Sequence, residues 1–392
     1  MDPMAKLTET RPAEAGMDPD RLARAAQVLD EGIERELYPG GVLWVERRGV
    51  TALVHSAGHT DFDRTTSVDE NTLYDLASVT KPVAMGSSML LLCQDGRVHL
   101  GEPATDFFPD RSLPHLKNVT LRHLLTHTSG LPPWKDMYSK GQTREQLIDE
   151  LLMIPLDHEP GTHYAYSCLG YIMLSIVLNT ISGERLDEFA RKRIFEPLGM
   201  SETTYNPDKS ANRPIAATDH CPMRKCKLIG DVHDGNACAM DGVSGNAGLF
   251  STPNDLAKFC RSIMLREAFC PEAASDARPC VPKAFGTHSR APASPFSPPV
   301  VARMFAKAIP ESLGGQTIGW FTHPNDMLCA GDLASSRAIA HSGFTGTAVV
   351  IDPEYELFAI LLTNRVCREG EGTEFRHLRR RIFNAILGSI VW

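Results

Sequence analysis

Ser78 and Lys81, in Ser78-Val79-Thr80-Lys81, are the first residues of the chain whose types and spacing suggest nucleophilic chemistry. On a helix, positions three apart share a face, so the hydroxyl and the ammonium would lie side by side. A hydroxyl is a poor nucleophile until a neighbour takes its proton or stabilises its anion, and an adjacent lysine can do both. Taken alone, this spacing fits a helix cap followed by a solvated lysine better than it fits a catalytic pair. Residues 78–94 are apolar nearly all round, however, and a lysine that begins such a buried helix needs a polar partner.

A second candidate is Tyr166-Ser167-Cys168, which follows Pro160-Gly161 and precedes an apolar helix predicted over residues 169–178. A phenol near a lysine ammonium can lose its proton at lower pH and serve as a general base. The alternative is an aromatic side chain that only packs at the start of a helix.

The third candidate is His341-Ser342-Gly343-Phe344, which stands just before a predicted strand at residues 347–351. Small residues at this place would let a substrate lie along the strand edge and bond to backbone groups. A glycine-rich turn with no chemical role is the alternative.

Elements at both ends of the chain must position these residues. A helix is predicted from Asp18, which can cap it, with Pro19 at its first position. Strands are predicted at residues 42–46 and 51–56, joined by a hairpin turn, and again at 347–351 and 357–363; a final helix follows, with Leu378, Ile382 and Ile386 on one face. Strands at both ends with helices between them predict an α+β fold, in which one antiparallel sheet is built from both termini.

Together, the three candidates resemble the serine β-lactamase and penicillin-binding-protein superfamily, and within it the class C-like branch that includes family VIII carboxylesterases, D-aminopeptidases and DD-peptidases. Further segments agree with this resemblance: Leu124–Leu131, Pro197–Met200, Val232–Asp234, Gly248–Thr252 and Leu362–Arg365.

The resemblance implies a single β-lactamase/DD-peptidase-like domain over residues 18–390. Its α/β part would comprise 18–100 and 300–392, its mainly helical inserted part 101–268, and the Pro-rich stretch 269–299 would form a loop or lid. It also implies that Ser78 is acylated, with Lys81 and Tyr166 handling protons. The backbone N–H groups of Ser78 and Phe344 would form the oxyanion hole, and no cofactor or metal would be needed.

Two departures from the branch bear on the substrate. Cys168 stands where the branch usually has Asn or Asp, and a thiol bonds weakly to a substrate amide. His341-Ser342-Gly343 stands where true class C β-lactamases have Lys-Thr-Gly, and a histidine is mostly neutral at pH 7. We therefore expect Cys168, His341, Ser342 and Gly343 to contact substrate, and uncharged esters to be preferred over anionic β-lactams.

Composition excludes several other classes of protein. The chain has 392 residues with 48 acidic and 40 basic side chains, which gives no electrostatic reason to bind nucleic acid or anionic membrane. The longest apolar runs fall far short of the ~18 residues of a membrane span. With no secretory signal pattern at its start, the protein is expected to be cytoplasmic. The basic run 376–381 is interpreted as the solvated face of the final helix.

Other chemistries fit the sequence less well. His220, Cys221, Cys226, His233 and Cys238 match no familiar zinc spacing, and no Gly-x-Ser-x-Gly motif occurs. The sequence therefore predicts a serine hydrolase that works through an acyl-enzyme on a small-molecule ester, as a carboxylesterase with weak or no β-lactamase activity. The alternatives are a β-lactamase, a D-amino-acid peptidase or DD-peptidase, or a penicillin-recognising sensor that does not turn over.

Overall fold

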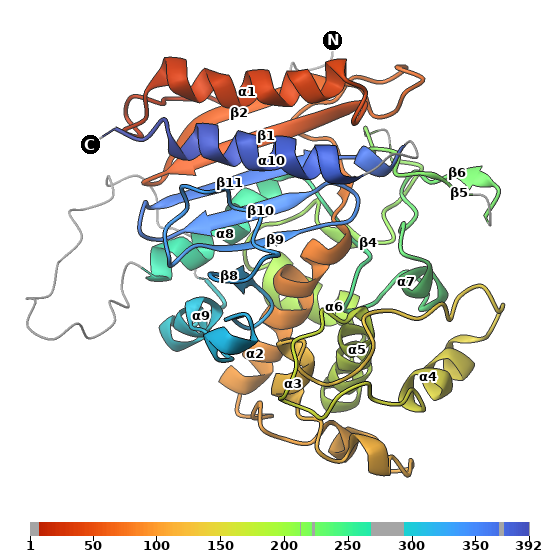
Figure 1. Cartoon of the computed structure of the whole chain (residues 1–392). Coiled ribbons are helices and arrows are strands. Elements are labelled where there is room, and N and C mark those ends of the chain that lie inside the picture. The colour runs from red at the N-terminus through yellow and green to blue at the C-terminus, as the bar shows by residue number, and fades with distance from the viewer. Residues whose placement is uncertain (1–7, 212, 222–223, 268–293, 368–371, 392) are drawn as a thin grey trace, which may run out of the picture.

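The computed structural model describes residues 8–211, 213–221, 224–267, 294–367 and 372–391 (Figure 1). Most of the Pro-rich stretch 269–299, expected to be a loop or lid, lies outside the described residues. The strands are β1 Gly40–Arg47, β2 Val50–Gly58, β3 Tyr74–Asp75, β4 Thr204–Tyr205, β5 His220–Cys221, β6 Cys226–Lys227, β7 Leu249–Ser251, β8 Phe321–Thr322, β9 Ile339–Ser342, β10 Ala348–Asp352 and β11 Leu357–Thr363. The helices are α1 Pro19–Glu34, α2 Ser87–Gln94, α3 Leu121–Leu125, α4 Arg144–Leu152, α5 Cys168–Ser182, α6 Leu186–Ala190, α7 Gly235–Ala239, α8 Pro253–Glu267, α9 Pro298–Phe305 and α10 Gly372–Leu387.

Strands from both ends of the chain form a six-stranded sheet in the order β2-β1-β11-β10-β9-β8. Every neighbouring pair is antiparallel, and β1 lies beside β11 with Val42 opposite Leu362. The predicted α+β architecture is thereby confirmed, since the first and last strands of the chain meet in the centre of one sheet.

Side chains alternate between the two faces of this sheet, and both faces are buried. In β1, Val42 and Trp44 join the larger core on the side of the helical region, whereas Leu43 and Val45 pack under α1 and α10. Helices α1 and α10 lie together over one face, while α8 and the helices of the middle of the chain lie on the other (Figure 1). Within the described residues, no helix is both long and apolar enough to cross a membrane.

Local signals in the sequence explain the ends of several elements. Asp18 caps α1 as predicted, its carboxylate accepting from the N–H groups of Asp20 and Arg21 at 3.0 and 3.1 Å. Arg48 and Gly49 join β1 to β2 with positive φ values of 53° and 73°, which suits a tight hairpin turn.

The single helix predicted over residues 78–94 is instead three consecutive helical segments that differ in pitch. A 3₁₀ turn spans Ala77–Val79, a wider π-type turn spans Lys81–Gly86, and regular α-helix begins only at Ser87. The reason lies at Pro82, which has no N–H to donate to the carbonyl of Ser78, so the α-helical bonding pattern cannot pass through it. Ser78 thus sits in a tight turn at the entrance to the buried helix.

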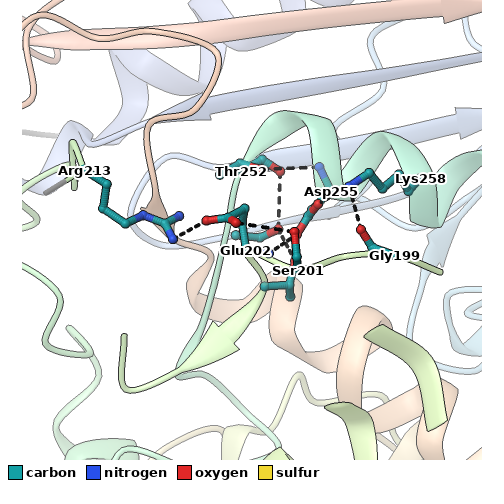
Figure 2. Close-up of polar contacts among 9 residues, drawn as sticks. Gly199, Ser201, Glu202, Arg213, Thr252, Asp255 and Lys258 are labelled. Carbon is teal, nitrogen blue, oxygen red and sulfur yellow. Dashed lines mark hydrogen bonds and ion pairs between the residues drawn. The ribbon is translucent and has the colours of Figure 1, made fainter. Parts of the chain in front are cut away.

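A buried carboxylate near the start of α8 ties this helix to the segment before β4. Asp255 is 1% exposed and accepts from the backbone N–H of Glu202 at 2.8 Å and from Thr203 Oγ1 at 3.0 Å. Its other oxygen accepts from Lys258 Nζ at 2.7 Å (Figure 2). Because β4 pairs with β7 and β7 pairs with β3, this carboxylate supports the small sheet that leads to Ser78.

Replacing Asp255 by alanine should lower the free energy of unfolding by about 2–3 kcal/mol, because a buried N–H and a hydroxyl lose their acceptor. Urea denaturation followed by circular dichroism measures this. Glu202→Ala is the matched control, since its exposed carboxylate pairs only with groups at the surface (Figure 2) and such pairs contribute ~0–1 kcal/mol. Equal losses for the two variants would show that the Asp255 contacts do not stabilise the fold.

Candidate active site

One cavity of about 590 Å³ brings the three sequence-predicted segments together. Ser78 and Tyr166 line it, as do Cys168, Ser342, Gly343 and Phe344. Segments separated by more than 250 positions in the chain therefore meet at the 3₁₀ turn that carries Ser78.

Lys81 lies directly beside Ser78 and is fully buried, with 0% of its surface exposed. Its Nζ is 3.0 Å from Ser78 Oγ and 2.9 Å from the carbonyl oxygen of Asn246, which accepts a hydrogen bond from it. Burial is the main influence on this group and lowers the pKa of the Lys81 amine. A neutral amine keeps a lone pair, so at this distance Lys81 can take the proton of the Ser78 hydroxyl.

Tyr166 forms part of the cavity wall, and Lys81 Nζ is 4.9 Å from the centroid of its ring. Burial raises the pKa of its phenol well above 10, and the neighbouring Ser78 hydroxyl lowers it only in part. The sequence-based expectation was that Lys81 would lower the pKa of this phenol; in the structure, burial raises it instead. Tyr166 is held as a protonated phenol, which can donate a proton or relay one, while the lowered pKa of Lys81 makes the amine the better base.

Tyr166 is positioned by the segment Leu124–Leu131. His127 has its Nδ1 3.1 Å from the N–H of Ser167, which donates to it, and its ring centroid is 4.5 Å from that of Tyr166. Ser167 in turn caps α5 through the N–H of Gly170 and donates from Oγ to the carbonyl of Pro132 at 2.7 Å. Ser167 therefore has a structural role, and His127 is a positioning residue that the sequence motif alone did not reveal.

The backbone before Ser78 is joined to the loop that follows β9. Thr345 Oγ1 donates to the carbonyl of Asp75 at 2.8 Å, and Thr347 Oγ1 donates to the carbonyl of Leu76 at 2.9 Å. A Cβ on Gly343 would lie only 2.2 Å from Thr347 Oγ1 and 2.4 Å from the Leu76 oxygen, so only glycine permits this approach.

This junction brings two backbone donors to the cavity. Ser78 and Phe344 both line it, and within the described residues neither backbone N–H donates to a protein acceptor. Two free donors beside a nucleophile can stabilise the oxyanion of a tetrahedral intermediate. The Ser78 and Phe344 N–H groups therefore stay the predicted pair of oxyanion-hole donors.

Known proteins place this geometry in a family. The sequence profile described as "Beta-lactamase" matches residues 25–382. The chain belongs to the Beta-lactamase family. It is 29% identical over 374 residues to the N-acetylmuramyl-L-alanine amidase of Bacillus subtilis (strain 168), covering 86% of this chain and 80% of that protein.

Solved structures show the same fold. "EstCE1, a hydrolase with promiscuous acyltransferase activity" superposes with a TM-score of 0.71 at 19% identity, covering 94% of this chain and 99% of that one. The octameric penicillin-binding protein homologue from Pyrococcus abyssi gives a TM-score of 0.70 at 19% identity, covering 94% and 78%. The chain is thus a serine hydrolase of the β-lactamase and penicillin-binding-protein superfamily, with the β-lactamase/DD-peptidase fold.

The two departures from the Beta-lactamase family pattern lie in different surroundings. Cys168 lines the cavity, with its Sγ 3.6 Å from Lys81 Nζ, and burial raises the pKa of the thiol, which keeps it neutral. His341 is fully buried and does not line the cavity; its ring stacks on Phe321 at 4.5 Å, and burial lowers its pKa well below 6.5. A neutral imidazole behind Tyr166 can influence a substrate only through its neighbours.

Asp75 is a second positioning residue that the sequence did not reveal. Its buried carboxylate accepts from the N–H of Ala77 at 2.8 Å and from the N–H of His233 at 2.7 Å. It thereby holds Ala77 at a φ of 45°, which is unusual for a residue with a side chain, directly before the nucleophile. Burial raises the pKa of Asp75 to about 6. The same contact fixes His233 and Asp234, which both line the cavity.

Several arginines also belong to the cavity lining. Arg365, Arg376, Arg379 and Arg380 all line it. The interpretation of the run 376–381 as a solvated face is therefore wrong for Arg379, which is only 9% exposed. Its position could not be read from helical periodicity, because periodicity shows which residues share a face but not what lies opposite that face.

Proposed function

We propose that this protein is a carboxylesterase that forms an acyl-enzyme on Ser78. The observation that carries the proposal is the 3.0 Å contact between Ser78 Oγ and the Nζ of a fully buried Lys81 whose pKa is lowered. This contact supplies what a serine nucleophile lacks, namely a base within reach whose lowered pKa favours the neutral amine.

The geometry supports a two-step reaction. Lys81 accepts the proton of the Ser78 hydroxyl as Oγ attacks the substrate carbonyl, and the N–H groups of Ser78 and Phe344 stabilise the resulting oxyanion. The alcohol then leaves with a proton that passes through the Tyr166 phenol, and the acyl group stays on Ser78. In the second step, water loses a proton to the same groups and attacks the acyl carbonyl, which releases the acid and restores the hydroxyl.

The preference for esters rests on Cys168. A thiol beside Lys81 is a weak donor and a weak acceptor, so it binds the N–H or carbonyl of a substrate amide poorly. An ester has no N–H to satisfy at this place. The relative from B. subtilis is named an amidase, which makes amide hydrolysis the second candidate.

Three substrates distinguish these activities: p-nitrophenyl butyrate, nitrocefin and a D-alanyl peptide, compared by kcat/KM. We expect the ester to be turned over fastest. Faster turnover of the peptide or of nitrocefin would overturn the esterase assignment in favour of a peptidase or a β-lactamase. Acylation by nitrocefin with no turnover of any substrate would indicate a sensor.

Replacing Tyr166 by phenylalanine should lower kcat by about 10²–10⁴-fold, because the variant keeps the ring but loses the group that relays the proton. The loss should be smaller for p-nitrophenyl esters, whose leaving group needs no proton, than for alkyl esters. Stopped assays with ethyl butyrate and p-nitrophenyl butyrate measure this difference. Near-normal kcat on ethyl butyrate would mean that Tyr166 has only a structural role.

A further inference from the structure

A cluster of arginines forms one wall of the cavity that holds Ser78. We define the arginine cluster as Arg365, which follows β11, together with Arg376, Arg379 and Arg380 of α10. The spacing of the last three places their side chains on neighbouring parts of one helix face. The cluster thus brings four guanidinium groups to a single side of the cavity.

Among the described residues, these guanidinium groups have few polar partners. No carboxylate among the described residues forms an ion pair with a member of the cluster, and Arg376 donates only to Thr373 Oγ1, at 2.9 Å. Arg379 is 9% exposed, and its Nε has no hydrogen-bond partner within the same residues. By contrast, Arg381 on the other side of α10 pairs with Glu31 of α1 at 2.8 Å.

The positive charges of the cluster also act on one another. The pKa of Arg365 is lowered to about 10, mainly by burial and then by the charges of Arg379 and Arg376. Asp234 and Asp326 line the same cavity, yet neither is among the groups that shift the pKa of Arg365 or Arg379. Like charges held together in a partly buried place leave a favourable site for an anion.

The cluster is connected to the reaction centre through Phe344. The Arg365 guanidinium lies 4.7 Å from the centroid of the Phe344 ring and 5.7 Å from that of Phe375, and Arg379 also lies over Phe375, at 5.6 Å. Phe344 carries one of the two oxyanion donors. A group bound by the cluster would therefore lie in the same cavity as the scissile bond at Ser78.

We propose that the arginine cluster binds a carboxylate of the substrate, so that the preferred esters carry a negative charge on one side of the scissile bond. This inference rests on the proposed esterase function and names its substrate class. The planar guanidinium fork matches a carboxylate in geometry as well as in charge. It replaces the expected preference for uncharged esters, which followed from the missing cation at His341, because arginines in the cavity lining supply the positive charge.

The test uses two pairs of esters, each matched in shape and differing in charge. Mono-p-nitrophenyl adipate against its methyl ester places the carboxylate on the acyl side, and 4-(butyryloxy)benzoate against its methyl ester places it on the leaving group. We measure the ratio of kcat/KM for the charged and uncharged member of each pair. The ratio should exceed 1 for one pair and should fall roughly tenfold or more in Arg376→Gln and in Arg379→Gln.

Arg381→Gln is the control, because it removes the same charge from α10 at a residue outside the cavity lining, and its ratio should match that of the parent protein. If buried Arg379→Gln fails to fold, the exposed Arg376→Gln still decides the question. Ester turnover that depends on Ser78 but shows no charge preference, or a preference unchanged in the Arg376 variant, would overturn this inference and leave the esterase intact. Absence of any turnover of all four esters would overturn the esterase function itself.

Discussion

Ser78→Ala should lower kcat on p-nitrophenyl butyrate about a thousandfold or more, because it removes the hydroxyl that lies 3.0 Å from Lys81 Nζ and that would form the covalent intermediate. Lys81 would then face an alanine and would have no hydroxyl to deprotonate. Since Ser78 sits in a short turn held by backbone contacts, the melting temperature should change little. Initial rates and a thermal melt of the same preparation measure both effects.

A fluorophosphonate probe identifies the nucleophile independently of any substrate. Mass spectrometry should find the probe on Ser78 in the parent protein and no label in the Ser78→Ala variant. Ser201→Ala is the control, since this serine does not line the cavity and its hydroxyl donates to the exposed carboxylate of Glu202 (Figure 2), so labelling should be unchanged. A label on another serine or on Cys168 would contradict the proposed mechanism.

Lys81→Met should be at least as damaging as the loss of Tyr166, with kcat reduced about a thousandfold or more, because it removes the base that contacts Ser78 directly. Methionine fills a similar volume without an amine. Lys81→Arg is the informative companion, because it keeps a positive charge but cannot become neutral. Both variants should be inactive; activity in the arginine variant would show that a fixed cation, and not a base, is needed.

The lowered pKa of Lys81 also sets the dependence on pH. In the parent protein, kcat/KM should rise with pH as Lys81 loses its proton, at a pH below the 10.4 of a free lysine. Between the folded and the unfolded pKa, the unfolded chain binds one more proton than the folded one. The free energy of unfolding should therefore rise with pH in that window. In Lys81→Met this slope should be absent, and the variant should be no less stable than the parent near pH 7.

The reacting pair and the main elements could be predicted from the sequence because their signals are local. Ser78 and Lys81 are three positions apart, and any helical turn brings them together. Asp18 starts α1 by accepting hydrogen bonds from the first free N–H groups of the helix, and Pro19 has no N–H that would need a partner there. In β1 and β11, the β-strand pattern of side chains depends on the local sequence and not on which strand lies alongside. The resemblance to the Beta-lactamase family depended on short motifs of this kind.

Only the tertiary structure decided which side chains face the cavity and what their environment does to them. Whether His341 or Ser342 faces the site depends on how β9 sits in the sheet, since neighbours along a strand point to opposite faces. The raised pKa of the Tyr166 phenol and the lowered pKa of the Lys81 amine both follow from burial by segments far away in the chain. Arg365 and Arg379 line the same cavity as Ser78 because α10 packs over one face of the sheet, and the charge pattern along one helix does not show where that helix packs.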